Sequence, residues 1–275
     1  MSAPSAAAEA ARCGILLHPA GHTLSPTLHA AAYGELGLDA RYEVFDVPPA
    51  VLHTTLARLR SEGVRQLSVS LPHKESVIAL CDHVSESVQH IGAANTLTRI
   101  GGNLHAENTD WLGVVRSLEA HGSWRDARAT VIGAGGAARG VVYALRQLGC
   151  TVTLVNRTRA RAERIAQQLG ARLGTLDEPY DILVNTTSLG MQPHTEGSPV
   201  PFERLRSEAL VFDIVYAPLE TRLLREARVR GCRTQDGLDM LVHQAVEQVQ
   251  LWSGRRPSPS TLRAAAERAL AARES

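Results

Sequence analysis

The chain has 275 residues, of which 44% are hydrophobic and only 4% aromatic, so it is long enough for two domains, or one large one, with aliphatic cores. Its 29 basic and 28 acidic residues leave a formal net charge of +1, which argues against nucleic acid or a membrane as the main partner. No segment approaches 18 uninterrupted apolar residues, and the first twelve residues lack the features of a secretory leader. The composition predicts a soluble α/β enzyme of the cytoplasm.

Cysteines and histidines give no sign of a metal centre. The four cysteines are far apart and form no C-x-x-C pair, which is typical of reduced thiols in the cytoplasm. His18 and His22 are four residues apart, but Pro19 and Gly21 between them predict a loop and not one helix face. We therefore expect no metal site.

The first part of the chain alternates between expected strands and helices, as judged from the spacing of apolar residues and from a glycine pair typical of a hairpin turn. The expected strands are 13–17, 41–47, 66–69, 96–100 and 103–107, and the expected helices are 26–36 and 51–62. This alternation predicts a mostly parallel sheet.

Two hydroxyl residues stand where the first strand gives way to the first helix. Thr23 and Ser25, with the free N–H groups of a helix N-terminus, could hold a substrate carboxylate. Alternatively, Ser25 is only the N-cap and Pro26 the first helical residue. The local pattern does not distinguish these two interpretations.

Lys74 and Asp110 are the candidates for catalysis. Lys74 lies just beyond the third strand, on the carboxyl side of the sheet where open α/β folds bind ligands. Asp110 follows the hairpin and precedes a helix expected at 111–120. Lysines at element ends are mostly solvated, and an aspartate before a helix is often its cap. If the two meet, the carboxylate would hold the ammonium in place for general acid–base catalysis.

A glycine-rich turn follows the next expected strand, 129–132. Gly133-Ala134-Gly135-Gly136-Ala137-Ala138 matches G-x-G-x-x-A, the dinucleotide-binding fingerprint. The first glycine permits the tight turn, the second lets backbone N–H groups approach a pyrophosphate, and the last small residue lets the helix pack on its strand. Alone the match is weak evidence, but a helix at 136–148 and a strand at 151–155 complete a βαβ unit.

The residues after that second strand favour NADP over NAD. An NAD site usually has an acidic residue there for the ribose 2′-hydroxyl, whereas this chain has Asn156-Arg157-Thr158 and then Arg161. An arginine fork suits a 2′-phosphate because its planar donors bind two oxygens at once. The alternative is that both arginines are merely solvated charges at the start of a helix.

The remaining expected elements complete a two-domain architecture. They are strands 181–185 and 210–213 and helices 159–169, 221–230, 237–253 and 261–272. The last two helices have no strand partners, so we expect them to cover the first sheet. The sequence thus predicts an N-terminal α/β substrate-binding domain, 1–110, completed by helices 238–275. A Rossmann-type NADP-binding domain, 111–237, would face it across a cleft.

Taken together, the motifs resemble those of the shikimate dehydrogenase family, in order and spacing, from about Gly14 to Pro257. They are His22-x-x-Ser25-Pro26, Pro72-x-Lys74, Gly92-Ala93-x-Asn95-Thr96, Asn108-Thr109-Asp110, Gly133 to Ala138, Asn156-Arg157-Thr158-x-x-Arg161, Asn185-x-Thr187-Ser188-x-Gly190-Met191, Val215-Tyr216-x-Pro218-x-x-Thr221 and Gly237-x-x-Met240-Leu241-x-x-Gln244. The resemblance implies reversible NADPH-dependent reduction of 3-dehydroshikimate to shikimate, a step of aromatic amino acid biosynthesis.

The resemblance also implies roles for individual residues. Lys74 would be the acid/base at the C3 oxygen, and Asp110 would orient it and bind a ring hydroxyl. The other substrate ligands would be Thr23 and Ser25, at the carboxylate, and Ser70, Asn95, Tyr216 and Gln244, at the ring. The cofactor contacts would be Glu86, Gly133, Ala134, Gly135, Gly136, Ala137, Asn156, Arg157, Thr158, Arg161, Thr187, Ser188, Met191, Ile214 and Gly237.

Two departures from the family pattern bear on the substrate. Thr23 replaces the usual first carboxylate-binding serine, and Ser68-Val69-Ser70 replaces Asn-Val-Thr. Quinate or an aminoshikimate is therefore an alternative substrate, and a non-catalytic NADP-binding sensor is a remote alternative function. As partners we expect only the small-molecule substrate and cofactor, for a monomer or homodimer.

Overall fold

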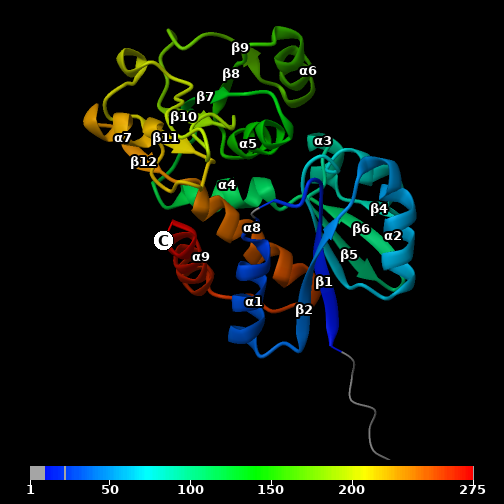
Figure 1. Cartoon of the computed structure of the whole chain (residues 1–275). Coiled ribbons are helices and arrows are strands. Elements are labelled where there is room, and N and C mark those ends of the chain that lie inside the picture. Colours follow the sequence, from blue (N-terminus) through cyan, green and yellow to red (C-terminus); the bar gives the residue numbers. More distant parts are fainter. Residues whose placement is uncertain (1–9, 22, 275) are drawn as a thin grey trace, which may run out of the picture.

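A computed structural model describes residues 10–21 and 23–274, with only the backbone at Glu274. It shows two α/β domains, each built on a six-stranded sheet (Figure 1). This confirms the fold class predicted from the sequence. His22, which the motif comparison included, lies outside the described residues.

The first sheet has the strand order β2-β1-β3-β5-β6-β4. Its strands are β1 (Ala11–Leu17), β2 (Ala40–Asp46), β3 (Gln66–Val69), β4 (His83–Val84), β5 (Thr96–Ile100) and β6 (Asn103–Glu107). Only β5 runs against its neighbours β3 and β6, so the sheet is mostly parallel. The helices of this part are α1 (Ser25–Leu36), α2 (Leu52–Ser61) and α3 (Glu86–Ile91), with 3-10 turns at Pro49–Val51 and Ser76–Leu80.

The second sheet is parallel throughout and has the order β12-β11-β10-β7-β8-β9. Its strands are β7 (Arg128–Ile132), β8 (Thr151–Val155), β9 (Arg172–Leu173), β10 (Ile182–Asn185), β11 (Leu210–Asp213) and β12 (Arg233–Gln235). Its helices are α5 (Gly136–Gln147), α6 (Arg159–Leu169) and α7 (Arg222–Val229), with a 3-10 turn at Phe202–Arg204. The strand order reverses between β7 and β10, and a ligand site is expected at the carboxyl ends of strands at such a point.

Two helices carry the chain between the domains. Helix α4 (Asp110–Glu119) leads from the first domain to the second, and α8 (Gly237–Ser253) leads back, continuing into α9 (Pro259–Glu274) (Figure 1). They cross in close contact: a Cβ placed on Gly113 of α4 would lie 2.5 Å from the backbone oxygen of Met240 in α8. The returning helices cover one face of the first sheet together with α1, as expected from their lack of strand partners.

Each sheet is buried between helices. In the first domain, α1, α8 and α9 share one apolar cluster, while α2 packs with Leu16 and Leu67 on the other side of the sheet. In the second domain, α4, α5 and α6 pack on one face and α7 on the other. Burial on both faces is typical of parallel sheets.

Two helix starts differ from the sequence-based expectation. Ser25 is the first residue of α1 and the N-cap is Leu24, so the interpretation of Ser25 as the cap is wrong. The hydroxyl of Thr23 accepts from the backbone N–H of Ser25 at 3.2 Å. Asp110 is likewise the first residue of α4, after Thr109. Both polar side chains are therefore free for other contacts. The short elements β4, α3, β9 and β12 were not expected, because two to six residues carry little periodic signal.

No helix among the described residues is long and apolar enough to cross a membrane.

Candidate functional site

The candidate site of the first domain forms where the ends of three strands meet. Because β5 runs antiparallel to β3 and β6, its first residue, Thr96, pairs with Ser68 near the end of β3 and with Glu107 at the end of β6. The segments that carry Lys74, Asn95 and Asp110 therefore leave the sheet at one edge, although they are far apart in the sequence. Lys74 is tied to this edge because its backbone oxygen accepts a hydrogen bond from Ala94, 2.7 Å.

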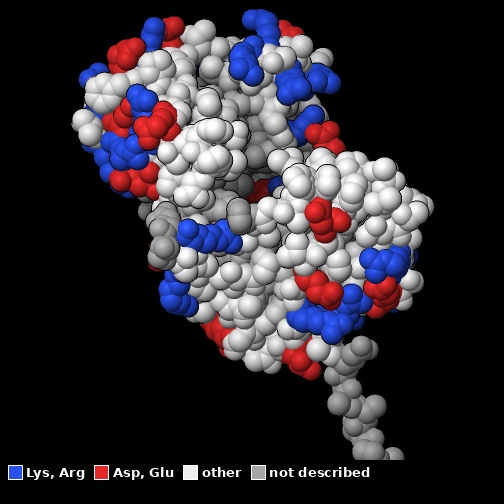
Figure 2. Space-filling model, viewed as in Figure 1, with Lys and Arg blue, Asp and Glu red and all other residues white. Residues whose placement is uncertain are grey.

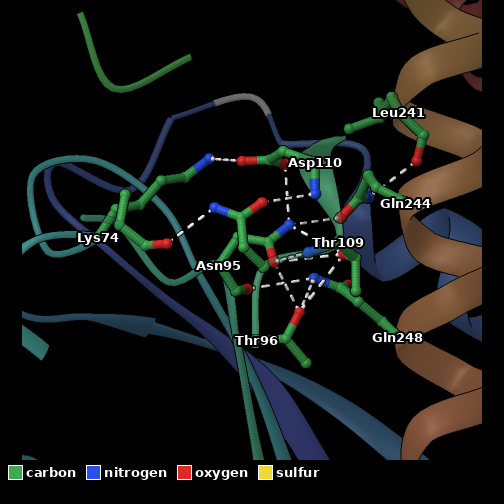
Figure 3. Close-up of polar contacts among 10 residues, drawn as sticks. Lys74, Asn95, Thr96, Thr109, Asp110, Leu241, Gln244 and Gln248 are labelled. Atoms are coloured by element: carbon green, nitrogen blue, oxygen red, sulfur yellow. Dashed lines mark hydrogen bonds and ion pairs between the residues drawn. The ribbon is translucent and has the colours of Figure 1, made fainter. Parts of the chain in front are cut away.

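Lys74 and Asp110 form an ion pair. The Nζ of Lys74 donates to Oδ2 of Asp110 at 2.6 Å, and the two side chains are 18% and 11% exposed (Figure 3). Asp110 stands in the first turn of α4, where the helix dipole favours a carboxylate. The pair is held in place yet still open to a ligand. Lys74 is also the only lysine in the sequence. The other 28 of the 29 basic residues are arginines.

Asn95 holds the other oxygen of Asp110. Its Nδ2 donates to Oδ1 of Asp110 at 2.8 Å, to the hydroxyl of Thr109 at 3.0 Å and to Oε1 of Gln244 at 3.4 Å (Figure 3). Its Oδ1 accepts from the backbone N–H of Thr109 at 2.7 Å and from the hydroxyl of Thr96 at 2.8 Å. Asn95 and Gln244 are buried, so this amide has one orientation and fixes the carboxylate.

The other predicted substrate ligands lie on neighbouring elements of the same domain or beside it. The hydroxyl of Thr23 donates to that of Ser25 at 3.1 Å, which places the two side chains together just before and at the start of α1. Ser70 follows β3, and its backbone N–H donates to Leu16 at 2.9 Å. Tyr216 is partly buried against the cluster formed by α1, α8 and α9, and this burial raises the pKa of its phenol.

The glycine loop of the second domain fits a pyrophosphate. Gly133 has φ +116°, and a Cβ there would lie 2.4 Å from the hydroxyl of Thr186, so the tight turn requires glycine. A Cβ on Gly135 or Gly136 would meet nothing within 4 Å, which means that space is open at the start of α5. No side chain caps α5, so its first N–H groups face this space, with Ala134 and Ala137 beside them.

Arginines gather over α6 beside the loop after β8 (Figure 2). Arg157 and Arg161 are exposed, and within the described part of the chain their side chains have no ion pair or hydrogen bond. Arg159 differs, because its Nε donates to Glu163 at 2.8 Å. The two unpaired arginines stand next to Asn156 and Thr158, whose own contact is a hydrogen bond from the Asn156 amide to the Thr158 backbone oxygen, 2.8 Å.

The remaining predicted cofactor residues lie in the loop after β10, at the end of β11 and at the start of α8. Figure 2 shows a hollow between the two domains. The hydroxyl of Thr187 donates to Asn185 at 2.7 Å, while Ser188 and Met191 are exposed. Gly237 abuts the end of β11: a Cβ there would lie 2.2 Å from the backbone oxygen of Ile214. The structure therefore brings Ile214 and Gly237 together.

Glu86 is the predicted cofactor residue with the least structural support. It begins the short helix α3 of the first domain and is exposed. Its charge affects Tyr143 of α5 in the second domain. Burial, and to a smaller extent the charge of Glu86, raises the pKa of the Tyr143 phenol. No described contact joins Glu86 to the glycine loop.

Sequence reasoning missed a buried polar cluster behind Asn95. Its members are the buried His29, Ser68, Thr96 and Gln248 and the partly buried Tyr42, all linked by side-chain hydrogen bonds. One signal was available: Gln244 and Gln248 are four residues apart, so they share the helix face that the apolar residues occupy. Within residues 10–21 and 23–274, no group of three or more His, Cys, Asp or Glu side chains is arranged to hold a metal ion.

A Rossmann-type domain with an open glycine loop, facing a lysine–aspartate pair across a cleft, defines a nicotinamide-dependent oxidoreductase. The family descriptions that match the chain are "Shikimate dehydrogenase substrate binding domain" (residues 15–97), "Shikimate / quinate 5-dehydrogenase" (116–192) and "Shikimate 5'-dehydrogenase C-terminal domain" (237–267). Shikimate dehydrogenase (NADP(+)) of Symbiobacterium thermophilum is 42% identical, with 94% of each chain covered. The chain belongs to the shikimate dehydrogenase family, which confirms the resemblance found in the motifs.

Solved structures agree with this assignment. Shikimate 5-dehydrogenase of Thermus thermophilus, in complex with NADP(H) and shikimate, has a TM-score of 0.90 and 41% identity, covering 94% of this chain and 99% of that one. Quinate dehydrogenase of Corynebacterium glutamicum, in complex with NAD, has a TM-score of 0.86 and 29% identity, covering 93% of this chain and 98% of that one.

Proposed function

We propose that this protein catalyses the reversible NADPH-dependent reduction of 3-dehydroshikimate to shikimate, a step of aromatic amino acid biosynthesis. The observation that carries the proposal is the Lys74–Asp110 pair in a cleft that an open glycine loop faces. The named relatives of about 40% identity support the substrate and the cofactor. In solution, the absorbance of NADPH formed from shikimate and NADP tests the proposal directly, and absence of turnover would favour an NADP-binding sensor.

In this proposal Lys74 is the general acid of the reduction. NADPH, when bound, supplies the hydride. Lys74 gives a proton to the C3 oxygen as charge develops there, and an ammonium beside that oxygen stabilises the charge. Asp110 keeps the ammonium in position and accepts from a ring hydroxyl. Reversal of the steps makes Lys74 the base in shikimate oxidation.

The remaining predicted ligands divide between substrate and cofactor. Thr23 and Ser25 hold the substrate carboxylate, and Ser70, Asn95, Tyr216 and Gln244 hold the ring. The α5 N-terminus with Gly133–Ala137 holds the pyrophosphate, and Asn156, Arg157, Thr158 and Arg161 hold the adenosine and its 2′-phosphate. Thr187, Ser188, Met191, Ile214 and Gly237 lie along the nicotinamide half, and Glu86 faces the cofactor from the first domain.

A second candidate is a dehydrogenase of broader range that also oxidises quinate or an aminoshikimate. Thr23 favours it, because threonine keeps the hydroxyl that the family places here as serine but adds a methyl group beside the carboxylate site. The structural similarity to a quinate dehydrogenase is consistent with it. Values of kcat/KM for shikimate, quinate and aminoshikimate separate the candidates.

The same proposal covers organisation. Residues 1–110 with 238–275 form the substrate domain and 111–237 the cofactor domain, in a cytoplasmic monomer or homodimer. Size-exclusion chromatography with light scattering measures the oligomeric state.

A further inference from the structure

Gln248 is a polar side chain at the centre of the helical face that covers the first sheet. It lies on α8, four residues after Gln244, and is 2% exposed. Its amide contacts three other elements: His29 of α1, Ser68 of β3, and the start of β5 at Asn95 and Thr96. An apolar residue would fill such a position at less cost, since a buried amide must be fully hydrogen-bonded.

The orientation of this amide is determined by its neighbours. Ser68 Oγ accepts from Tyr42 at 2.6 Å and from Gln66 at 3.2 Å, so its one hydrogen goes to Oε1 of Gln248, 2.8 Å away. Burial lowers the pKa of His29 to about 4, so its ring is neutral near pH 7 and donates through Nε2 to the same oxygen at 3.1 Å. The Nε2 of Gln248 must therefore point the other way.

That amino group points at Asn95. Nε2 of Gln248 donates to the backbone oxygen of Asn95 at 3.2 Å and to the hydroxyl of Thr96 at 3.0 Å (Figure 3). The Thr96 hydroxyl donates in turn to Oδ1 of Asn95 at 2.8 Å. Gln248 thus holds both the backbone and the side chain of the residue that binds Oδ1 of Asp110, one hydrogen bond from Lys74.

We propose that Gln248 is a positioning residue for the Lys74–Asp110 pair, acting through Asn95 and Thr96. The inference rests on the proposed dehydrogenase function. Its physical basis is a directional chain of buried hydrogen bonds. This chain restricts the Asn95 side chain to one orientation, and Asn95 in turn restricts the Asp110 carboxylate to one orientation. Among the described residues, the Gln248 side chain has no hydrogen bond to Lys74 or Asp110 themselves.

The single lysine of the chain allows a direct test that needs no substrate. Protein labelled with [ε-13C]lysine gives one side-chain signal, from Lys74. Gln248→Met keeps the length of the side chain and removes its hydrogen bonds. Gln250→Met is the matched control, because Gln250 is exposed on the same helix, and among the described residues its side chain is hydrogen-bonded only to Arg256.

We expect the Lys74 signal of Gln248→Met to move toward that of a solvated lysine. We also expect kcat to fall about ten- to a hundred-fold, as for other small misplacements of catalytic groups, with the KM for NADPH unchanged. Gln250→Met should match the wild type in all three. A folded Gln248→Met protein with the wild-type lysine signal would overturn the proposal, whether or not kcat falls. An inactive wild-type enzyme would refute the proposed function instead.

Thr96→Val provides a second test should Gln248→Met not fold. It removes the hydroxyl between Gln248 and Asn95 but keeps a β-branched side chain suited to β5. We expect the same displacement of the lysine signal and a fall in kcat. An unchanged signal in the folded Thr96→Val protein would also overturn the proposal.

Discussion

Lys74 stands alone among the basic residues of this protein. An arginine would make a comparable ion pair with Asp110 and is used at every other position of positive charge. An arginine, however, does not release its proton in proteins, whereas a lysine can act as an acid or a base. The retention of one lysine at this place therefore agrees with proton transfer and not merely with charge.

Lys74→Met and Lys74→Arg separate these two roles. We expect both variants to fold and both to lose about 10²- to 10⁴-fold in kcat, because neither can give or take the proton. Circular dichroism checks the fold, and NADPH absorbance checks turnover. Substantial activity in Lys74→Arg would mean that the residue supplies only charge.

Arg157 is the residue on which we expect the preference between cofactors to depend. We expect Arg157→Ala to raise the KM for NADPH about 10- to 100-fold, the equivalent of losing a charge-assisted contact of about 1.5 to 3 kcal/mol, with little change for NADH. Arg159→Ala is the control, since that side chain is engaged with Glu163. Equal effects of Arg157→Ala on both cofactors would show that the arginine does not contact the 2′-phosphate.

At the scale of elements, β10, β11 and α7 meet at Asp213. Its carboxyl accepts from Asn185 at 2.9 Å, from the backbone N–H of Val215 at 3.1 Å and from Thr221, the N-cap of α7, at 2.7 Å. Burial raises the pKa of Asp213 from 3.8 to about 6 in spite of these bonds. These hydrogen bonds of Asp213 join the end of β10, whose following loop lies in the proposed nicotinamide half of the site, to β11 and α7.

This carboxyl makes the stability of the fold depend on pH. Between about pH 4 and 6 the folded state binds the proton more tightly than the unfolded chain, so the contribution of Asp213 to the free energy of unfolding falls as pH rises, by up to about 1.4 kcal/mol per unit. The free energy of unfolding of Asp213→Asn, measured by urea titration, should therefore increase relative to that of the wild type as the pH is raised from 4 to 7.

Asp181→Asn is the control with the opposite sign. The ion pair with Arg128 lowers the pKa of Asp181, so its contribution is lost as pH falls. A difference between wild type and Asp213→Asn that does not vary with pH would contradict the burial argument.

For the whole molecule, the crossing of α4 and α8 sets how the domains face each other. Both helices carry parts of the candidate site, Asp110 at the start of α4 and Gln244 within α8, and Gly113 lets them touch. We therefore expect a small change in the distance between these two helices to alter both the arrangement of the domains and the geometry of the site.

Gly113→Ala should separate the two helices. The added methyl would lie 2.5 Å from the Met240 oxygen, so we expect a loss of about 1 to 3 kcal/mol in the free energy of unfolding and reduced turnover. Gly34→Ala, in α1 where a Cβ meets nothing within 4 Å, should stabilise by up to about 1 kcal/mol. Thermal unfolding and the NADPH assay measure both. Equal behaviour of the two variants would contradict the close crossing.

Much of this architecture could be read from local patterns. The hairpin strands β5 and β6, strand β8 and helices α6 and α8 have the bounds that their sequence patterns predict. A long helix or strand can be predicted because the burial of one face repeats its apolar pattern along the chain. The short elements β4, α3 and β12 carry no such pattern and depend mainly on contacts with their neighbours. The order of motifs also identified the family.

The sequence by itself determined the glycine turn, the arginines beside it, the presence of Lys74 and Asp110, and the class of chemistry. Each of these depends on residue type and short-range spacing. Only the tertiary structure decided that Lys74, Asn95 and Asp110 meet at one edge of the sheet, and that Gln248 lies behind the pair. Those facts depend on the antiparallel register of β5 and on a helix that returns from the second domain, and such long-range contacts leave no local pattern in the chain.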